Sequence, residues 1–135
     1  MIELDHAIGA VGHAATVVAA DNTAVTLGSG ALPIYGTPAL AALIEQAAVQ
    51  ALQSHLPLGM TSLGTCLKIN HLAATPLGHN VQAEATLIAA SGRRLEFRVA
   101  AFDEREKIAE GTHERFIVDA ARFMERMAAK RPKGS

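Results

Sequence analysis

Residues 35–52 read YGTPALAALIEQAAVQAL, and this stretch decides the fold. Thr37 and Pro38 are typical of a helix start, because threonine can cap a helix and proline suits its first position. Alanine and leucine, both strong helix formers, dominate the residues after this start, so we expect a helix from Thr37 to about Gln53. Apolar residues lie nearly all round this helix, which predicts that the rest of the protein encloses it.

Glu45 is the one charged residue within this helix. An ionised carboxylate is costly to bury without a partner. Either this face of the helix is turned to water, or the carboxylate is held in place for chemistry.

The sequence after the helix changes to strand-like runs with short connections, which are typical of antiparallel neighbours. One long helix against such a sheet predicts an α+β fold, and a sheet wrapped around a central helix is the hot-dog architecture. We expect a single domain over residues 1–135, with a further strand before the helix. The four later strands are predicted at residues 61–73, 80–90, 94–103 and 107–118.

Three further segments complete this expectation. Residues 13–20 indicate the strand before the helix, and residues 23–30, after a turn, indicate a second strand or an extended arm. At the other end, residues 119–130 predict an amphipathic C-terminal helix.

The composition excludes several functional classes. Half of the 135 residues are hydrophobic, 19% are charged and the net charge is -1, which is typical of a globular domain. Aromatic residues are scarce and no basic patch stands out, so we expect no nucleic-acid partner. No apolar run is long enough to cross a membrane, no signal-peptide pattern opens the chain, and the lone Cys66 fits a reducing compartment. We therefore expect a cytoplasmic protein with no membrane partner, and the histidine spacing predicts no metal site.

The first predicted strand after the helix carries a candidate catalytic histidine. Strand alternation places one set of side chains on the more apolar face, which should meet the helix. His71 at the end of this face could pair with Glu45, since a buried carboxylate and an imidazole satisfy each other. A structural alternative is a hydrogen-bonded core pair without catalysis. The predicted inward set is Thr61, Leu63, Thr65, Leu67, Ile69 and His71.

Three further residues have both a functional and a structural interpretation. Thr37 lies about 80° from Glu45 around the helix axis, so both could border one cavity, although Thr37 could also be a plain cap. Gly64 interrupts a strand, which indicates either a bulge or a substrate carbonyl close to the backbone. Arg115 lies between two carboxylates, and most such arginines are surface ion-pair partners.

Three long segments together resemble a known family, the hot-dog thioesterases related to fluoroacetyl-CoA thioesterase. The pattern THxAATPxG of that family is matched by NHLAATPLG, with Asn70 as the departure. The resemblance implies a catalytic set of Thr37, Glu45 and His71. It also implies that Gly64 lies against the thioester and that Arg115 supports the site. The segments are TPALAALIEQAA, SLGTCLKINHLAATPLGHNVQAEATL and GRRLEFRVAAFDEREKIAEGTHERFIV.

The resemblance also implies partners and a substrate. It implies an acyl-CoA substrate, with coenzyme A as part of that substrate and no other cofactor, and a homodimer or a dimer of dimers. The loop before the helix, GSGALPIYG, contains Leu32, Ile34 and Tyr35 but not the aromatic gate residue of the fluoroacetyl enzymes. We therefore expect a small or short-chain acyl group, contacted by Ile34 and Tyr35.

Thioester hydrolysis assigns a role to each of these groups. Glu45 would act as the base for water or as the direct nucleophile, His71 would move protons, and Thr37 would orient Glu45 or bind the carbonyl oxygen. The alternatives are a non-catalytic module that binds acyl-CoA or another hydrophobic ligand, and a hydratase or dehydratase of the same fold. A purely structural pair of Glu45 and His71 is the remaining possibility.

Overall fold

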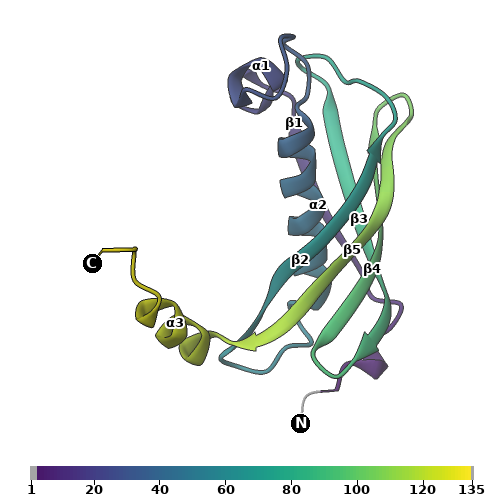
Figure 1. Ribbon diagram of the computed structural model, residues 1–135. Coiled ribbons are helices and arrows are strands. Elements are labelled where there is room, and N and C mark those ends of the chain that lie inside the picture. Colours follow the sequence, from purple (N-terminus) through teal and green to yellow (C-terminus); the bar gives the residue numbers. More distant parts are fainter. Residues whose placement is uncertain (1–2, 135) are drawn as a thin grey trace.

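The structure is a computed structural model that describes residues 3–134. Figure 1 shows an antiparallel sheet that curls around one long helix, α2 (Thr37–Leu52). This is the α+β arrangement that the sequence predicts. The strands are β1 (Val11–Val17), β2 (Met60–His71), β3 (Asn80–Ser91), β4 (Arg94–Asp103) and β5 (Lys107–Asp119).

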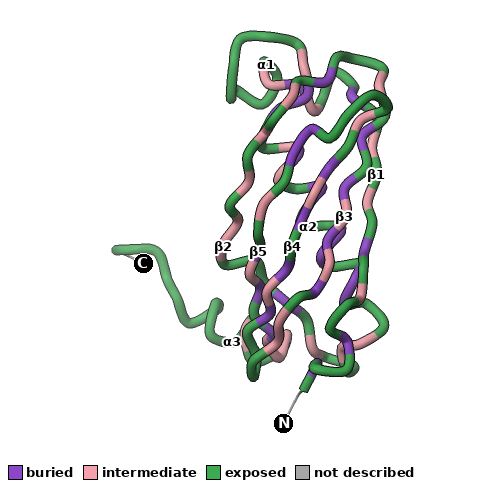
Figure 2. The backbone as a smooth tube through the Cα atoms, turned by 90° about the vertical axis from the view of Figure 1, so that its right-hand side faces the viewer, coloured by how far each residue is buried: buried purple, intermediate pink, exposed green. Residues whose placement is uncertain are grey.

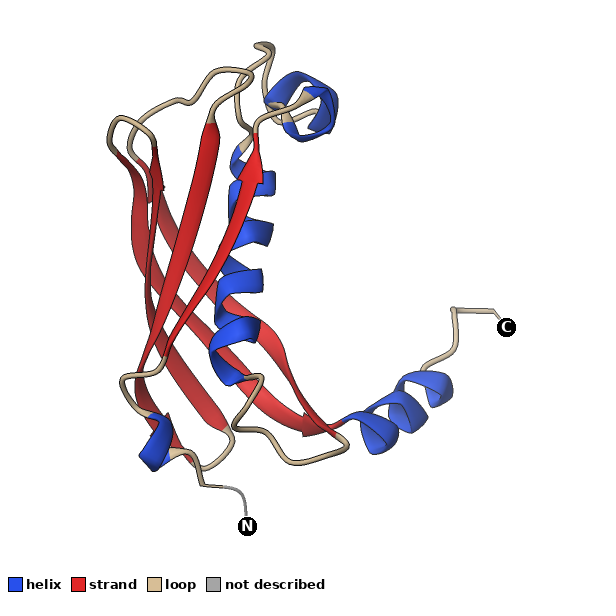
Figure 3. Ribbon diagram, turned by 180° about the vertical axis from the view of Figure 1, so that it is seen from behind, coloured by secondary structure: helices blue, strands red, loops and turns tan. Residues whose placement is uncertain are grey.

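The sheet has the strand order β1-β3-β4-β5-β2, and every neighbouring pair is antiparallel. The helix lies on the concave face, which is visible from behind in Figure 3. β1 and β2 form the two edges, and β2 pairs only with β5 within residues 3–134. β2, at one edge of the sheet, therefore places its candidate site residues beside α2.

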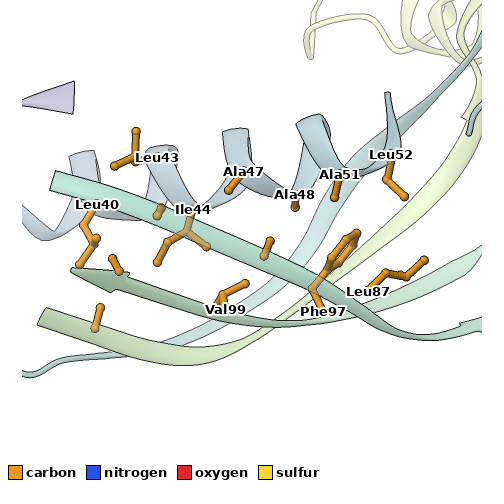
Figure 4. Packing of buried hydrophobic residues seen from close by; sticks show 14 of the residues in the cluster. Leu40, Leu43, Ile44, Ala47, Ala48, Ala51, Leu52, Leu87, Phe97 and Val99 are labelled. Atoms are coloured by element: carbon orange, nitrogen blue, oxygen red, sulfur yellow. The ribbon is translucent and has the colours of Figure 1, made fainter. Parts of the chain in front are cut away.

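The core lies between the concave face of the sheet and one face of α2. Strands β3 and β4 alternate buried and more exposed residues, as Figure 2 shows along their length. Figure 4 shows Phe97 and Leu87 packed beneath the helix. Buried helix residues recur every three or four positions, as expected for one face of an α-helix: Leu40, Leu43, Ile44, Ala47, Ala48, Ala51 and Leu52.

A close crossing brings β1 against α2. A side chain at Gly12 would put its Cβ 2.0 Å from the Ala47 carbonyl oxygen and 2.4 Å from the Ala51 nitrogen. Only glycine allows the strand to approach the helix backbone this closely. The strand begins at Val11, two residues before the predicted start, because this crossing needs the strand to include Gly12.

The prediction that the rest of the protein largely encloses α2 holds for one side of the helix only. Its outer strip is exposed, with Val49 48% exposed and Ala42, Gln46 and Gln50 open as well. The sheet curls around the opposite side of the helix and leaves this strip uncovered. The fold of a single chain therefore does not explain why this strip carries Ala42 and Val49 beside its two glutamines.

Residues 23–30 do not form the predicted strand or extended arm. They hold a short helix, α1 (Ala24–Leu27), which ends at Gly28 in the left-handed conformation with φ of 76°. A single bridge between Thr23 and Tyr35 is the strand-like pairing in this region. The threonine-rich sequence favours a strand, but the left-handed glycine closes the chain into a helical turn.

The C-terminal helix α3 (Ala120–Ala129) agrees with the prediction. Asp119 caps it by accepting a hydrogen bond from the Arg122 backbone N–H at 3.1 Å. None of its residues is buried, and Figure 1 shows it leaving the body of the molecule after β5. No helix in the part of the chain that the structure describes is long and apolar enough to cross a membrane.

A bulge in β2 overturns the strict alternation predicted for that strand. The pairing with β5 shifts between Gly64 and Cys66, so Thr65 is an extra residue. Before the bulge the inward residues are Ser62 and Gly64, not Thr61 and Leu63. After it the predicted phase returns, and Leu67 and Ile69 pack on the core as expected.

Candidate active site

The first half of the candidate site is a hydroxyl–imidazole pair at the start of α2. The Oγ of Thr37 lies 2.8 Å from Nδ1 of His71, which is the last residue of β2. The sequence suggests that Thr37 caps the helix with its side chain. In the structure the N-cap is Gly36, and Thr37 makes no capping hydrogen bond. Its hydroxyl is therefore free for the histidine.

A docked loop holds His71 in this position. The Tyr35 backbone N–H donates to the Thr75 carbonyl at 2.9 Å, so the loop before α2 is fastened to the loop after β2. Thr75 is itself buried and donates to Asp103 at 2.8 Å. The AATP segment of the sequence thus anchors the loop that directly follows His71.

The ionisation of His71 is perturbed by its surroundings. Burial lowers the pKa of His71, and the approach of the Ala73 backbone raises it in part, although no hydrogen bond of normal geometry joins the two. Its Nε2 atom is buried without a hydrogen-bond partner within residues 3–134. The lowered pKa favours the neutral imidazole, whose Nε2 makes no hydrogen bond of its own within the described residues.

The second half of the candidate site is the Glu45 carboxylate. Its Oε2 accepts from Nη1 of Arg115 at 3.3 Å, and the Glu45 side chain is 44% exposed. The same oxygen lies over Gly64, where a Cβ would come within 2.4 Å of it. Gly64 is thus part of a bulge, as one interpretation held, and the group that lies close to its backbone is the Glu45 carboxylate. The other interpretation, a substrate carbonyl close to this backbone, stays a prediction.

The variant Gly64→Ala tests this close approach. The added methyl group would collide with Glu45 Oε2 and lie 3.2 Å from Nη1 of Arg115, so the carboxylate must move. For the thioester hydrolysis that the family resemblance implies, we expect kcat to fall about 100-fold, since small misplacements of reacting groups have effects of this size. Thr65→Ala in the same bulge is the control, and an equal loss in both variants would contradict this role of Gly64.

Arg115 is not the surface ion-pair partner that its sequence context favours. It is 5% exposed, and its guanidinium is occupied by protein groups. Nε donates to the Ser62 hydroxyl at 2.8 Å and Nη2 to the Ser62 carbonyl at 3.0 Å. Burial lowers the pKa of Arg115 and Glu45 raises it in part, but guanidinium stays charged in any ordinary environment.

Within one chain the structure does not join Glu45 to His71. Across the described residues no hydrogen bond or ion pair links them, and each has another partner. Glu45 lies eight positions after Thr37 in α2, which is about 12 Å along the axis. The expected direct pair of Glu45 and His71 is therefore absent in the single chain.

The two halves border different cavities. Thr37 and His71 line a cavity of about 400 Å³, together with Ile34 and Tyr35 of the loop before α2. Glu45 lines a groove of about 790 Å³ together with Arg115. Burial raises the pKa of Tyr35 to about 12, so its hydroxyl stays protonated beside the first cavity.

Two lowered histidine pKa values predict how stability depends on pH. Burial lowers the pKa of His71 and of His113, so below the ordinary value of about 6.5 the unfolded chain binds more protons than the folded one. Stability must then fall as the pH drops from about 7.5 to 5.5. Thermal unfolding at both pH values would show a lower Tm at the acidic one. The shift should shrink in His71→Ala, and equal Tm values in wild type would contradict the assignment.

His113 is a buried polar residue that the sequence interpretation did not single out. It is 1% exposed, and its ring nitrogens face Cys66 and Arg115. The signal was its spacing: His113 and Arg115 are two residues apart on one strand and share a face. The described residues contain no group of three or more histidine, cysteine, aspartate or glutamate side chains placed to hold a metal ion.

A curled antiparallel sheet around one helix, with a carboxylate, a hydroxyl and an imidazole along that helix, defines a hot-dog protein of the thioesterase type. The family pattern of the fluoroacetyl-CoA-specific thioesterase (FlK) matches residues 18–121. The fluoroacetyl-CoA thioesterase of Streptantibioticus cattleyicolor is 39% identical over 101 residues, which are 75% of this chain and 73% of that protein. The chain therefore belongs to the fluoroacetyl-CoA-specific thioesterase family.

Solved structures agree with this assignment. A structure of the fluoroacetyl-CoA thioesterase FlK superposes with a TM-score of 0.86 at 33% identity, covering 93% of this chain and 97% of that one. A hot-dog-like protein from Thermanaerovibrio acidaminovorans also has a TM-score of 0.86, at 27% identity over 95% of this chain and 96% of that one. The predicted hot-dog fold and family are confirmed.

Proposed function

We propose that this chain is an acyl-CoA thioesterase that hydrolyses small or short-chain acyl-CoA to free acid and coenzyme A. The observation that carries the proposal is the Glu45 carboxylate, which Arg115 of β5 holds over the Gly64 backbone. The helix that bears Glu45 also bears Thr37, the partner of His71. The fluoroacetyl-CoA thioesterase relative acts on a thioester of the same kind.

Glu45 can open the thioester by either of two balanced routes. In the direct route a carboxylate oxygen attacks the thioester carbonyl, the C–S bond breaks, and the thiolate of coenzyme A leaves. Water then cleaves the resulting anhydride and restores the carboxylate. In the other route Glu45 takes a proton from water as the water oxygen attacks the carbonyl. The C–S bond then breaks, the thiolate of coenzyme A leaves, and Glu45 gives up the proton to restore its carboxylate.

Thr37 and His71 manage protons and the carbonyl oxygen in this proposal. The Thr37 hydroxyl, bonded to a neutral imidazole, can donate to the oxygen that becomes negative in the transition state. His71 can take a proton from the attacking water, and the imidazolium so formed can then pass that proton to the thiolate of coenzyme A. No cofactor enters these steps, because coenzyme A is part of the substrate.

The loop before α2 supports the choice of a small acyl group. It lines the cavity beside Thr37 with Leu32, Ile34 and Tyr35, and the cavity of about 400 Å³ is modest for a ligand site. Phenylalanine is absent from this loop. We therefore assign short acyl groups without a preference for fluorinated ones.

A thiol-release assay over a panel of acyl-CoA esters tests the proposal. The panel varies chain length, halogenation and aryl groups, and free coenzyme A is detected with a thiol reagent. We expect turnover to be highest for the short members and similar for acetyl-CoA and fluoroacetyl-CoA. Saturable binding with no thiol release from any member would overturn the enzyme assignment in favour of a binding module.

We propose in addition that the active unit is a homodimer. The exposed strip of α2 and the separation of Glu45 from Thr37 and His71 support this, since a second copy on this strip would cover it and bring groups of both copies to one cavity. Light scattering coupled to size exclusion should give twice the mass of one chain. A monomer that retains full turnover would contradict the proposal.

A further inference from the structure

We infer that His113 is a positioning residue of this site, a neutral imidazole that aims Arg115 at Glu45. The inference rests on the proposed hydrolase function and adds to it a group that does not touch the substrate. Four hydrogen bonds among residues of β2 and β5 support the inference. In each of them, the chemistry of the two atoms decides which atom donates and which accepts.

The placement of His113 follows from strand β5. His113 and Arg115 alternate with exposed residues and both point to the concave side, where they are 1% and 5% exposed. Polar groups so deeply buried must be hydrogen-bonded or they destabilise the fold. Their partners are therefore part of what the fold specifies.

The proton on His113 can be assigned from its two neighbours. Nδ1 lies 2.8 Å from the Cys66 carbonyl oxygen, which can only accept, so Nδ1 carries the hydrogen. Nε2 lies 3.1 Å from Nη1 of Arg115, which can only donate, so Nε2 has none. Both neighbours thus require the same neutral tautomer. Burial lowers the pKa of His113 and the Arg115 charge lowers it further, while the Cys66 hydrogen bond and Glu45 oppose this.

The Arg115 guanidinium is fixed on two sides by these contacts. Ser62 takes the Nε hydrogen with its hydroxyl and an Nη2 hydrogen with its carbonyl oxygen. Nη1 has two hydrogens, of which one points to His113 and the other to Glu45. Because His113 accepts one Nη1 hydrogen, the other Nη1 hydrogen points to the Glu45 carboxylate.

The position of Glu45 depends on this direction. Its side chain is 44% exposed, and Arg115 is its hydrogen-bond partner within residues 3–134. A half-exposed carboxylate without a fixed partner samples several rotamers. A Cβ at Gly64 would come within 3.2 Å of both Arg115 Nη1 and His113 Cε1, so all three groups converge on one point.

The test compares two substitutions of His113. His113→Leu replaces the ring with an apolar side chain of similar size. Arg115 Nη1 and the Cys66 carbonyl then lose this hydrogen-bond partner. We expect kcat to fall about 10- to 100-fold with KM changed less than about threefold, because the reacting carboxylate is misplaced while the acyl-CoA contacts remain. His113→Gln, whose amide can accept from Arg115 and donate to Cys66, should restore most of kcat.

Ile117→Ala is the matched control for lost packing. Ile117 is the next inward residue on β5, is 1% exposed, and has an apolar side chain. We expect it to lower the Tm while kcat stays within about threefold of wild type. Circular dichroism of every variant at the assay temperature confirms that the folded fraction is the same.

Nitrogen NMR of the histidine rings separates this inference from the hydrolase proposal. We expect the His113 ring to carry its proton on Nδ1 in wild type, whether or not any acyl-CoA is hydrolysed. An Nε2-protonated or charged ring would overturn the inference. If wild type hydrolyses acyl-CoA, a His113→Leu kcat equal to wild type would overturn it as well. If wild type hydrolyses nothing, the hydrolase proposal fails, and so does the catalytic part of this inference.

Discussion

The variant Glu45→Gln is expected to lose about 100- to 10,000-fold in kcat, the range typical of a removed acid–base or nucleophilic group. The substitution keeps the size of the side chain and an oxygen that can still accept from Arg115. It removes the negative charge that would attack the thioester or take a proton from water. The protein should stay folded, because the Glu45 side chain is partly exposed. Thiol release under saturating acyl-CoA measures the change.

Glu110→Gln provides the matched control for Glu45→Gln. Glu110 is an exposed carboxylate on β5 that pairs with Lys107 at 2.7 Å, away from the candidate site. Its loss should leave kcat unchanged, since exposed pairs contribute little. Wild-type turnover in Glu45→Gln would remove the carboxylate from the mechanism.

The second large effect is expected in His71→Ala. This variant removes the hydrogen bond between His71 and the Thr37 hydroxyl, and with it the neutral imidazole that would move protons. We expect kcat to fall about 100- to 1,000-fold with little loss of stability. His13→Ala, which removes an exposed histidine of β1, is the control.

The two inactive variants together test whether a second copy completes the site. If Glu45 of one copy works with Thr37 and His71 of the other, subunits of Glu45→Gln and His71→Ala exchanged into one dimer contain an intact site. The mixture should then regain a measurable part of wild-type turnover. A mixture as inactive as its components would show that both groups must come from the same chain.

The elements of the fold could be predicted from local sequence because their signals are local. The helix start at Thr37 and Pro38, the alternation in β3 and β4, and the amphipathic pattern of α3 each lie within one segment. The hydrophobic period of a segment decides its type wherever no long-range contact competes. Residues 23–30 do not follow this rule. They form a helical turn that ends at Gly28 in the left-handed conformation, although their threonine and valine residues do not favour a helix.

The partners within the site could not be read from the sequence. The extra residue at Thr65 changes which side chains of β2 face the helix, and alternation cannot show where a bulge falls. For the same reason Ser62 was assigned outward, although it binds Arg115. The sequence predicts a pair of Glu45 and His71 because the strand face that ends at His71 should cover the helix that carries Glu45. In the structure Arg115, assigned from its context to the surface, is the partner of Glu45.

The most direct test of the central claim measures both products of acetyl-CoA turnover in water enriched in heavy oxygen. Coenzyme A is followed by its thiol and acetate by mass spectrometry, in wild type and in Glu45→Gln. We predict equal amounts of coenzyme A and labelled acetate from wild type, and nearly none of either from the variant. Release of both products at the same rate by the two proteins, or none by wild type, would contradict the role of Glu45 in thioester hydrolysis.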